Sequence, residues 1–208
     1  MKLLPNILLV VVVFFGTTPA RCAGATLLTF DELPTPQVLP GLNYTTIPSG
    51  YGNLLWNNFG VLNGIIRPAN EGYHAGTVSP DNVAFNLYGD PATISFGAGL
   101  FNLDAAYLTA ALNLDTILDI QVQGFAGTTL LYNNTYSVNR SAPSLINFGY
   151  VGVDRVTFIS SPAQQFAMDN LTVTIPEPST IGLMILNAAG FGLSGFRKIL
   201  KRGSGGTN

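Results

Sequence analysis

Hydrophobic and polar residues alternate with a period of two through most of this chain, and glycine, proline, asparagine or aspartate interrupts the alternation every eight to twelve residues. Such alternation places one set of side chains on each face of a strand, whereas a helical pattern would repeat about every 3.6 residues. The clearest case is the segment 117–123, with Leu118, Ile120 and Val122 on one face and Asp119, Gln121 and Gln123 on the other. The pattern predicts an antiparallel all-β domain.

We expect about ten strands in this body. They are Leu27 to Asp31, Trp56 to Leu62, Val83 to Leu87, Thr93 to Phe96, Ala105 to Ala111, Thr116 to Phe125, Thr128 to Val138, Ser144 to Phe148, Arg155 to Ser160 and Phe166 to Thr174. Many short strands with alternating burial favour a two-sheet antiparallel sandwich of the jelly-roll type. A closed barrel is the alternative.

The last expected strand changes parity along its length. Phe166 and Met168 share a face with Leu171 and Val173, although the two pairs differ by an odd number of residues. A β-bulge at Asp169-Asn170 would resolve this conflict, because a bulge inserts one extra residue and re-aims a side chain.

The first strand ends in a second acidic position, Asp31, followed by Glu32. The first and last strands of a sandwich often lie side by side, so Asp31 and Asp169 would together offer the oxygen ligands that calcium needs. The alternative is that both are strand-end acids that are solvated or accept hydrogen bonds from local backbone amides.

The two ends of the chain differ from the body. Lys2 is followed by an apolar segment from Ile7 to Phe15 and then by small residues, which is the layout of a secretory signal peptide. We expect residues 1–25 to be removed, so that one domain, residues 26–175, begins at Thr26. A cut three residues earlier and a lipid-anchored Cys22 are alternatives.

Residues 176–202 form a segment in three parts. Pro176, Glu177 and Pro178 open it, an apolar stretch of 16 residues from 181 to 196 follows, and it ends in the basic residues Arg197, Lys198, Lys201 and Arg202. Crossing a bilayer takes ~20 helical residues, so a stretch of 16 spans only where the bilayer is thinned. We therefore expect a transmembrane helix that spans at least transiently, with its basic end cytoplasmic and the body outside. An amphipathic or buried helix is the alternative. Residues 203–208 are predicted to be a flexible tail.

Charge and composition exclude several functions. Residues 26–175 contain three arginines, no lysine and ten acids, a net charge of −7, so nucleic acid is excluded as a partner. The only cysteine is Cys22 and the only histidine is His74, which excludes cysteine-histidine catalysis and clustered His/Cys zinc sites. His74 lies in sequence typical of an exposed loop, with no nucleophile motif nearby. We expect no enzyme activity.

Aromatic and amide side chains near the expected loops are the candidates for a ligand site. Tyr51, Trp56, Tyr73 and Asn57 combine flat rings with an amide, which suits stacking on a sugar and pairing with its hydroxyl groups. Core packing is the alternative and is favoured for Trp56, which begins a strand. Tyr51 and Tyr73 are therefore the better surface candidates.

Three segments, Thr29 to Pro34, Ile47 to Phe59 and Phe166 to Val173, together resemble a family of exported proteins of uncharacterised function. The body also resembles jelly-roll carbohydrate-binding modules, in which an acid after a phenylalanine of the first strand and an aspartate of the last strand bind a structural calcium; Asp31 and Asp169 match these positions.

The C-terminal segment resembles the bacterial Pro-Glu-Pro sorting signal (PEP-CTERM type), although Ile199 and Leu200 interrupt its basic cluster. The resemblance implies that the partners are the export machinery, the membrane and a dedicated sorting transpeptidase. We therefore expect a non-catalytic cell-surface or extracellular-matrix protein that binds polysaccharide. The alternatives are a purely structural surface protein and an extracellular glycan hydrolase.

Overall fold

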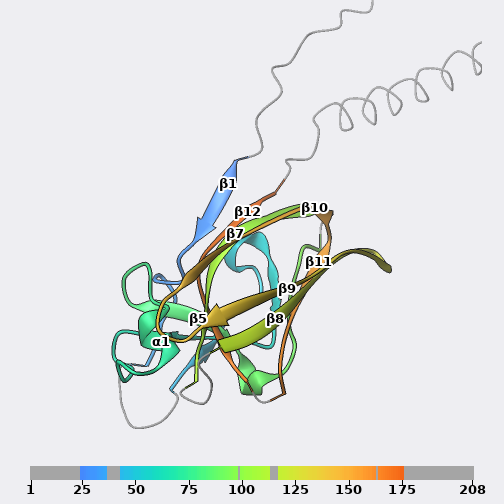
Figure 1. Cartoon of the computed structure of the whole chain (residues 1–208). Helices are drawn as coiled ribbons and strands as arrows, with labels where there is room; N and C mark the ends of the chain where they lie inside the picture. Colours follow the sequence, from blue (N-terminus) through green and yellow to red (C-terminus); the bar gives the residue numbers. More distant parts are fainter. Residues whose placement is uncertain (1–23, 37–42, 98, 113–116, 163, 176–208) are drawn as a thin grey trace, which may run out of the picture.

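The computed structural model describes residues 24–36, 43–97, 99–112, 117–162 and 164–175. These residues form two antiparallel sheets packed face to face (Figure 1), which confirms the predicted two-sheet sandwich. The expected Pro-Glu-Pro segment, its basic residues, the tail and nearly all of the expected signal peptide lie outside the described residues. Within the described part of the chain, no helix is long and apolar enough to span a membrane.

The seven-stranded sheet contains, in order, β10 (Ser144–Val153), β7 (Phe101–Ala110), β12 (Phe166–Thr174), β5 (Asn82–Asn86), β4 (Phe59–Asn63) and β2 (Thr45–Thr46), with β1 (Ala25–Leu28) paired to β12. The five-stranded sheet contains β3 (Leu55–Asn57), β6 (Ala92–Ser95), β11 (Arg155–Ser160), β8 (Ile117–Ala126) and β9 (Thr129–Asn139). Strands β5 to β12 thus follow the order β5-β12-β7-β10 in one sheet and β6-β11-β8-β9 in the other, which is a jelly roll. The described residues also form three short helices: η1 (Tyr51–Asn53), α1 (Gly72–Ala75) and η2 (Leu87–Gly89).

Most expected strands are confirmed, and β11 and β12 have the predicted bounds. The segment Trp56 to Leu62, predicted as one strand, is instead divided between two sheets. Asn58 separates β3 from β4 with a left-handed φ of 60°, and its side-chain amide donates to the carbonyl oxygens of Leu87 and Pro91. The chain therefore crosses from one sheet to the other at a single residue.

The predicted bulge in the last strand is confirmed. The register of β12 against β7 shifts between Asp169 and Thr172, and Asn170 has a left-handed φ of 51°. The first strand lies antiparallel beside the last, with Leu28 opposite Leu171. Phe166, Met168, Leu171 and Val173 all reach the core between the sheets, as the bulge requires.

The main core lies between the two sheets and contains a chain of edge-to-face aromatic contacts. Trp56 packs against Phe59 with ring centroids 5.3 Å apart, and Phe59 contacts both Phe158 and Phe166. Such contacts add about 0.5–1.5 kcal/mol each to the hydrophobic burial of the rings. They connect residues of β3 and β11 in one sheet to β4 and β12 in the other, and so hold the sandwich together.

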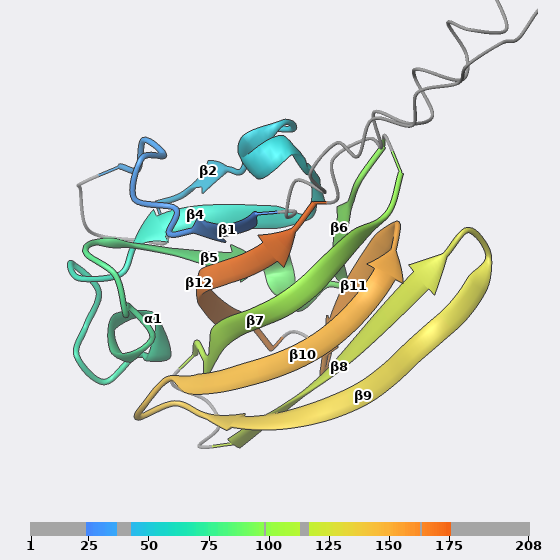
Figure 2. The same ribbon diagram turned by 90° about the horizontal axis from the view of Figure 1, so that it is seen from above.

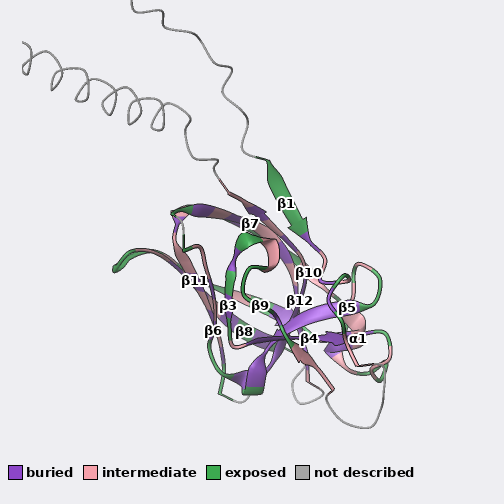
Figure 3. Ribbon diagram, turned by 180° about the vertical axis from the view of Figure 1, so that it is seen from behind, coloured by how far each residue is buried: buried purple, intermediate pink, exposed green. Residues whose placement is uncertain are grey.

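A second, smaller core covers the outer face of the seven-stranded sheet. Leu62, Val83 and Phe85 point away from the main core and pack around the buried ring of Tyr73 in α1. Strands β4 and β5 are consequently buried on both faces, and Figure 3 shows β5 in the colour of buried residues. Gly72 allows the helix to approach β7, because a Cβ there would lie 1.7 Å from the carbonyl oxygen of Ala110.

Candidate functional site

Asp169 is a fully buried carboxylate that holds the loop covering the seven-stranded sheet. Its Oδ2 accepts hydrogen bonds from the backbone N–H groups of Val78 (2.7 Å) and Ser79 (2.8 Å). Its Oδ1 accepts from the Ser79 hydroxyl (2.9 Å) and from the Asn170 N–H (2.6 Å). Burial raises the pKa of Asp169 above its usual range, and these donors act in the opposite direction because they favour the ionised form.

Asp31 binds the end of the same loop. Its Oδ1 accepts from the backbone N–H of Asn82 (3.0 Å), whose side-chain amide donates to the carbonyl oxygens of Phe30 (2.9 Å) and Leu33 (3.0 Å). Asp31 and Asp169 thus both accept hydrogen bonds from backbone amides, which is the kind of contact that the alternative to calcium predicted. Asn170 is a local donor to Asp169, whereas the other backbone donors are distant in sequence, about 50 residues from Asp31 and about 90 from Asp169.

An open pocket of about 360 Å³ lies beside Asp31, lined in part by Glu32, Asp81, Asn63 and Asn82. Asp169 does not line it. Among the described residues, no three His, Cys, Asp or Glu side chains are placed to hold a metal ion. Calcium binding by Asp31 and Asp169 therefore stays a prediction.

The structure contradicts the expectation that Tyr73 lies on the surface. Its ring is 0% exposed, and its hydroxyl donates to Gln165 Oε1 at 2.7 Å. Burial raises its pKa. Residues 71–76 have the composition of a loop, but Gly72–Ala75 within them form helix α1. The side of this helix that carries the Tyr73 ring packs on the seven-stranded sheet. His74 consequently lies in this helix and not in a loop, with Nδ1 3.2 Å from the carbonyl oxygen of Ile65.

Tyr51 and Trp56 form an aromatic cluster with Phe30. Trp56 is 7% exposed, in agreement with the core packing favoured for it, and its Nε1 donates to the carbonyl oxygen of Tyr51 at 2.9 Å. The Tyr51 ring is only partly exposed, and its hydroxyl accepts from the Phe30 N–H at 2.9 Å. Burial raises the pKa of Tyr51. Packing against Phe30 and against each other accounts for much of the surface of both rings, and a ligand role for Tyr51 and Trp56 stays a prediction.

Asn57 is the exposed member of the predicted ligand set, and it begins a line of polar side chains across the five-stranded sheet. The pairing of neighbouring strands places these residues opposite one another in order, and all point away from the core: Asn57, Thr93, Thr157, Gln123 and Asn133. We call this line the polar row. It offers amide and hydroxyl groups that both donate and accept hydrogen bonds, and it contains no charge.

Neighbouring side chains order the polar row. The hydroxyl oxygens of Thr93 and Thr157 lie 3.2 Å apart. The Asn133 Oδ1 accepts from the Gln121 Nε2 at 2.8 Å and from the Gln123 Nε2 at 3.4 Å. The row crosses five strands, so it extends for about 19 Å at ~4.8 Å per strand.

A second line runs parallel to the polar row, two residues further along each strand except at the irregular end of β9. Its members are Leu55, Ser95, Arg155, Phe125 and Leu130, and we call it the mixed row. The Arg155 guanidinium lies 4.2 Å from the centroid of the Phe125 ring. Leu55 and Leu130, at the two ends, are each 46% exposed. The outer face of the five-stranded sheet therefore combines a hydrogen-bonding line with a line that is apolar at Leu55, Phe125 and Leu130.

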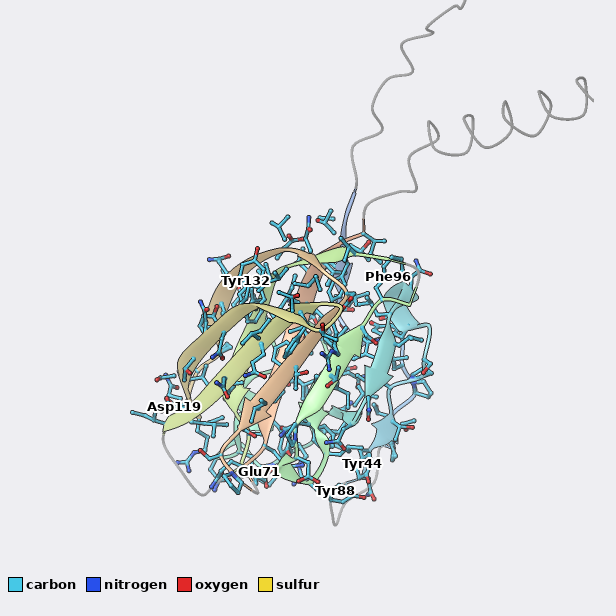
Figure 4. The ribbon with its side chains drawn as sticks, turned by 90° about the vertical axis from the view of Figure 1, so that its right-hand side faces the viewer. Tyr44, Glu71, Tyr88, Phe96, Asp119 and Tyr132 are labelled. Atoms are coloured by element: carbon cyan, nitrogen blue, oxygen red, sulfur yellow. The ribbon has the colours of Figure 1, made fainter. Side chains whose placement is uncertain are left out.

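Another aromatic pair lies away from this face. Tyr88 is 70% exposed and has a left-handed φ of 59°, and its hydroxyl lies 3.0 Å from that of Tyr44. The Tyr44 ring in turn contacts Phe85 edge to face at 5.5 Å. Figure 4 shows Tyr44 and Tyr88 side by side at the lower end of the view, far from Tyr132 and Asp119 of the β8–β9 hairpin.

Sequence reasoning found Asn57 but missed the other members of the polar row. The signal was present in part, because the polar positions of β6, β8, β9 and β11 are mostly threonine, glutamine and asparagine rather than charged residues. What the sequence lacked was the register, which brings residues as far apart as Asn57 and Asn133 into one line.

The fold and the outer face together define a jelly-roll sandwich with one sheet open to solvent. No protein-family model matches the chain. No curated protein sequence matches it.

Solved structures with a similar arrangement include an arabinose-bound MgGH51 α-L-arabinofuranosidase, with a TM-score of 0.44, 10% identity and coverage of 76% of this chain but 27% of that one. A family 16 carbohydrate-binding module has a TM-score of 0.35 and 13% identity, with coverage of 58% of this chain and 90% of that one. The CBM22-1-GH10 modules of the Clostridium thermocellum endo-1,4-β-D-xylanase 10B, complexed with xylohexaose, have a TM-score of 0.37 and 12% identity. The coverage is 61% of this chain and 26% of that one. This chain thus matches about a quarter of the first protein's length, and similarities this distant transfer neither ligand nor activity.

Proposed function

We propose that this chain is a non-catalytic, exported protein of the cell surface or extracellular matrix that binds a polysaccharide on the outer face of its five-stranded sheet. The observation that carries the proposal is the pair of parallel rows. A sugar ring has hydroxyl groups at its edge and C–H groups on its face, so it requires hydrogen-bonding side chains beside apolar ones. The polar row and the mixed row supply both, over a length that suits an oligosaccharide rather than a single sugar.

The charge of this face favours a neutral polymer. Arg155 is the one charged residue among the ten that form the two rows, whereas the body as a whole carries a net charge of −7. An anionic polysaccharide would be repelled by the rest of the body, and a neutral one would not. Uncharged amides and hydroxyls also lose less on leaving water than ionised groups do.

Binding is tested by isothermal titration and affinity electrophoresis of the full chain against a panel of soluble neutral polysaccharides. We expect Asn133→Ala and Gln123→Ala each to weaken binding several-fold, since each removes an amide worth about 1 kcal/mol of hydrogen bonding. Asn147→Ala is the matched control, because Asn147 is an exposed asparagine of β10, outside both rows. Binding that survives the loss of Asn133 and Gln123 but disappears in Tyr88→Ala would contradict this location, and no binding to any polymer would contradict the function.

Export and sorting rest on the sequence segments outside the described residues. Mass spectrometry of the mature protein tests them: a start near Thr26 supports export, and an end near Pro178 supports cleavage by a sorting transpeptidase. An intact C-terminus at Asn208 would instead support a retained membrane segment. A polysaccharide-degradation assay on the same protein tests the hydrolase alternative, and release of sugars would contradict a non-catalytic role.

The proposed calcium ion has a separate test. If Asp31 and Asp169 hold calcium, the melting temperature of the protein rises with calcium and falls with a chelator, because a ligand that binds only the folded state stabilises it. An unchanged melting temperature would contradict the calcium site and leave the polysaccharide proposal intact.

A further inference from the structure

The free edges of the two sheets differ in how they are protected. An edge strand presents unpaired N–H and C=O groups to any other strand, so proteins keep edges short or interrupt them with bulges, charges or proline. Here β1, β2 and β3 contain only four, two and three residues. Strand β10 is long, but its register shifts twice, next to Gly149 and Gly152, both of which have a left-handed φ.

Strand β9 has none of these protections along most of its length. It contains 11 residues and no charged residue, proline or glycine. From Tyr132 to Asn139 it pairs with β8 without interruption, and β8 is the only described strand with which it pairs. Figure 2 shows β9 as the outermost ribbon on its side of the sandwich. Most of its side chains are exposed, while Tyr132 and Tyr136 pack on β10 of the other sheet.

We propose that β9 is a self-association surface, at which a second copy of this chain adds its own β9 in antiparallel orientation about a twofold axis centred on Thr135. The inference rests on the edge itself and not on the proposed function. The partner must bring a free strand edge, and an identical β9 supplies one that is complementary to itself in the antiparallel sense.

Charge favours a second copy at this edge. Two bodies that each carry a net charge of −7 repel one another over most of their surface, and β9 is a long exposed stretch without any charge. In a register centred on Thr135, the two Thr135 side chains face each other and Asn133 lies opposite the partner's Ser137. Pairs of this kind form hydrogen bonds across antiparallel strands.

Pairing through β9 would also extend the outer face of the five-stranded sheet. Pairing β9 with a second β9 would join two five-stranded sheets into one continuous sheet, with both polar rows on the same side. A polymer that contacts one row would then be near the second, which raises the effective concentration of the second site.

Sedimentation velocity of the full chain in detergent, over a range of protein concentrations, tests the inference. We expect a concentration-dependent dimer that Thr135→Lys abolishes, since two like charges would face each other across the twofold axis. Leu145→Lys is the matched control, because it adds the same charge at a 51% exposed position of β10 and should dimerise as the unmodified chain does. A monomer at all concentrations, or an unchanged dimer in Thr135→Lys, would overturn the proposal.

Cross-linking provides a second, positive readout. Opposed side chains in an antiparallel pair have Cβ atoms about 4.5–5.5 Å apart, close to the separation that a disulfide spans. In a Cys22→Ser background, Thr135→Cys should form an oxidised dimer and Leu145→Cys should not. Equal cross-linking of the two variants would mean that β9 is not the contact. Polysaccharide binding by the monomeric Thr135→Lys variant separates this inference from the proposed function, which needs no dimer.

Discussion

The outer faces of the two sheets differ in how far other segments of the chain cover them. The seven-stranded sheet is covered by the loop from 64 to 81 and by α1, so that β4 and β5 are buried on both sides and a second core forms around Tyr73. The five-stranded sheet has no such cover among the described residues, and β6, β8 and β11 alternate between buried and partly exposed positions. Part of one outer face is buried and contributes to stability, and the other is open to solvent.

This difference separates residues that look alike in the sequence. Tyr73 and Tyr88 are both tyrosines between strands, and Asp169 and Asp119 are both acids within strands. In each pair the first lies under the cover of the seven-stranded sheet and the second lies in the open. Matched substitutions at these positions therefore test whether the cover is part of the folded core.

The largest expected effect is that of Tyr73→Ala. Removing a fully buried aromatic ring should lower the free energy of unfolding by about 3–5 kcal/mol, because a cavity is left and the bond to Gln165 is lost. Tyr88→Ala should change it by less than about 0.5 kcal/mol, since that ring is exposed. Urea denaturation followed by circular dichroism measures both. Similar losses in the two variants would mean that the segment covering the seven-stranded sheet is not part of the folded core.

The next effect is that of Asp169→Asn. The amide that replaces one carboxylate oxygen cannot accept the hydrogen bonds made there, so buried donors of Val78, Ser79 or Asn170 lose their partner, at a cost of about 2–3 kcal/mol. Asp119→Asn serves as the control at an exposed position of β8, with an expected change below about 0.5 kcal/mol. Equal midpoints of urea denaturation for the two variants would show that Asp169 does not anchor the loop.

A smaller effect is expected on the open face, for Arg155→Met. The substitution removes the cation from the Phe125 ring but keeps an unbranched side chain, so the loss should be about 0.5–1 kcal/mol. A double-mutant cycle with Phe125→Leu isolates the coupling between the two side chains. A coupling indistinguishable from zero would mean that the mixed row is not ordered by this contact.

The smallest effect on stability should come from Gln123→Ala in the polar row. Its side chain is partly exposed and its bond to Asn133 is long, at 3.4 Å, so the free energy of unfolding should change by less than about 0.5 kcal/mol. Polysaccharide binding should nevertheless weaken, which is the behaviour of a binding residue. A large loss of stability in the same urea assay would instead make the row part of the structural framework.

Much of the fold could be predicted because the local alternation of apolar and polar residues indicates where strands form. The faces of Leu118, Ile120 and Val122 were predicted from period alone, and the bulge at Asp169-Asn170 from a change of parity. The division at Asn58 was missed although a similar change of parity marks it, because Trp56 and Phe59 both reach the main core while an odd number of residues apart. Parity alone does not distinguish a bulge within one strand from a crossing between two sheets, which depends on the strands that pair on each side.

The candidate site was less predictable than the fold. Asn57 is exposed, as a ligand residue must be, whereas Tyr73 is buried because the connection between β4 and β5 folds back over those two strands. A tyrosine ring suits a core or a sugar surface equally well, and only its surroundings decide between them.

The sequence by itself determined that the body of this chain is a β-sandwich without a basic face, with the acid Asp31 soon after a first strand that lies beside a bulged last strand. It did so because side-chain periodicity, parity and charge are properties of neighbouring residues. Only the tertiary structure decided which sheet is covered, that Asp31 and Asp169 accept hydrogen bonds from the loop that ends at Asn82, and that five polar residues from five strands form one row. Those features depend on strand register and on the path of a loop across a sheet, which bring together residues that no local pattern relates.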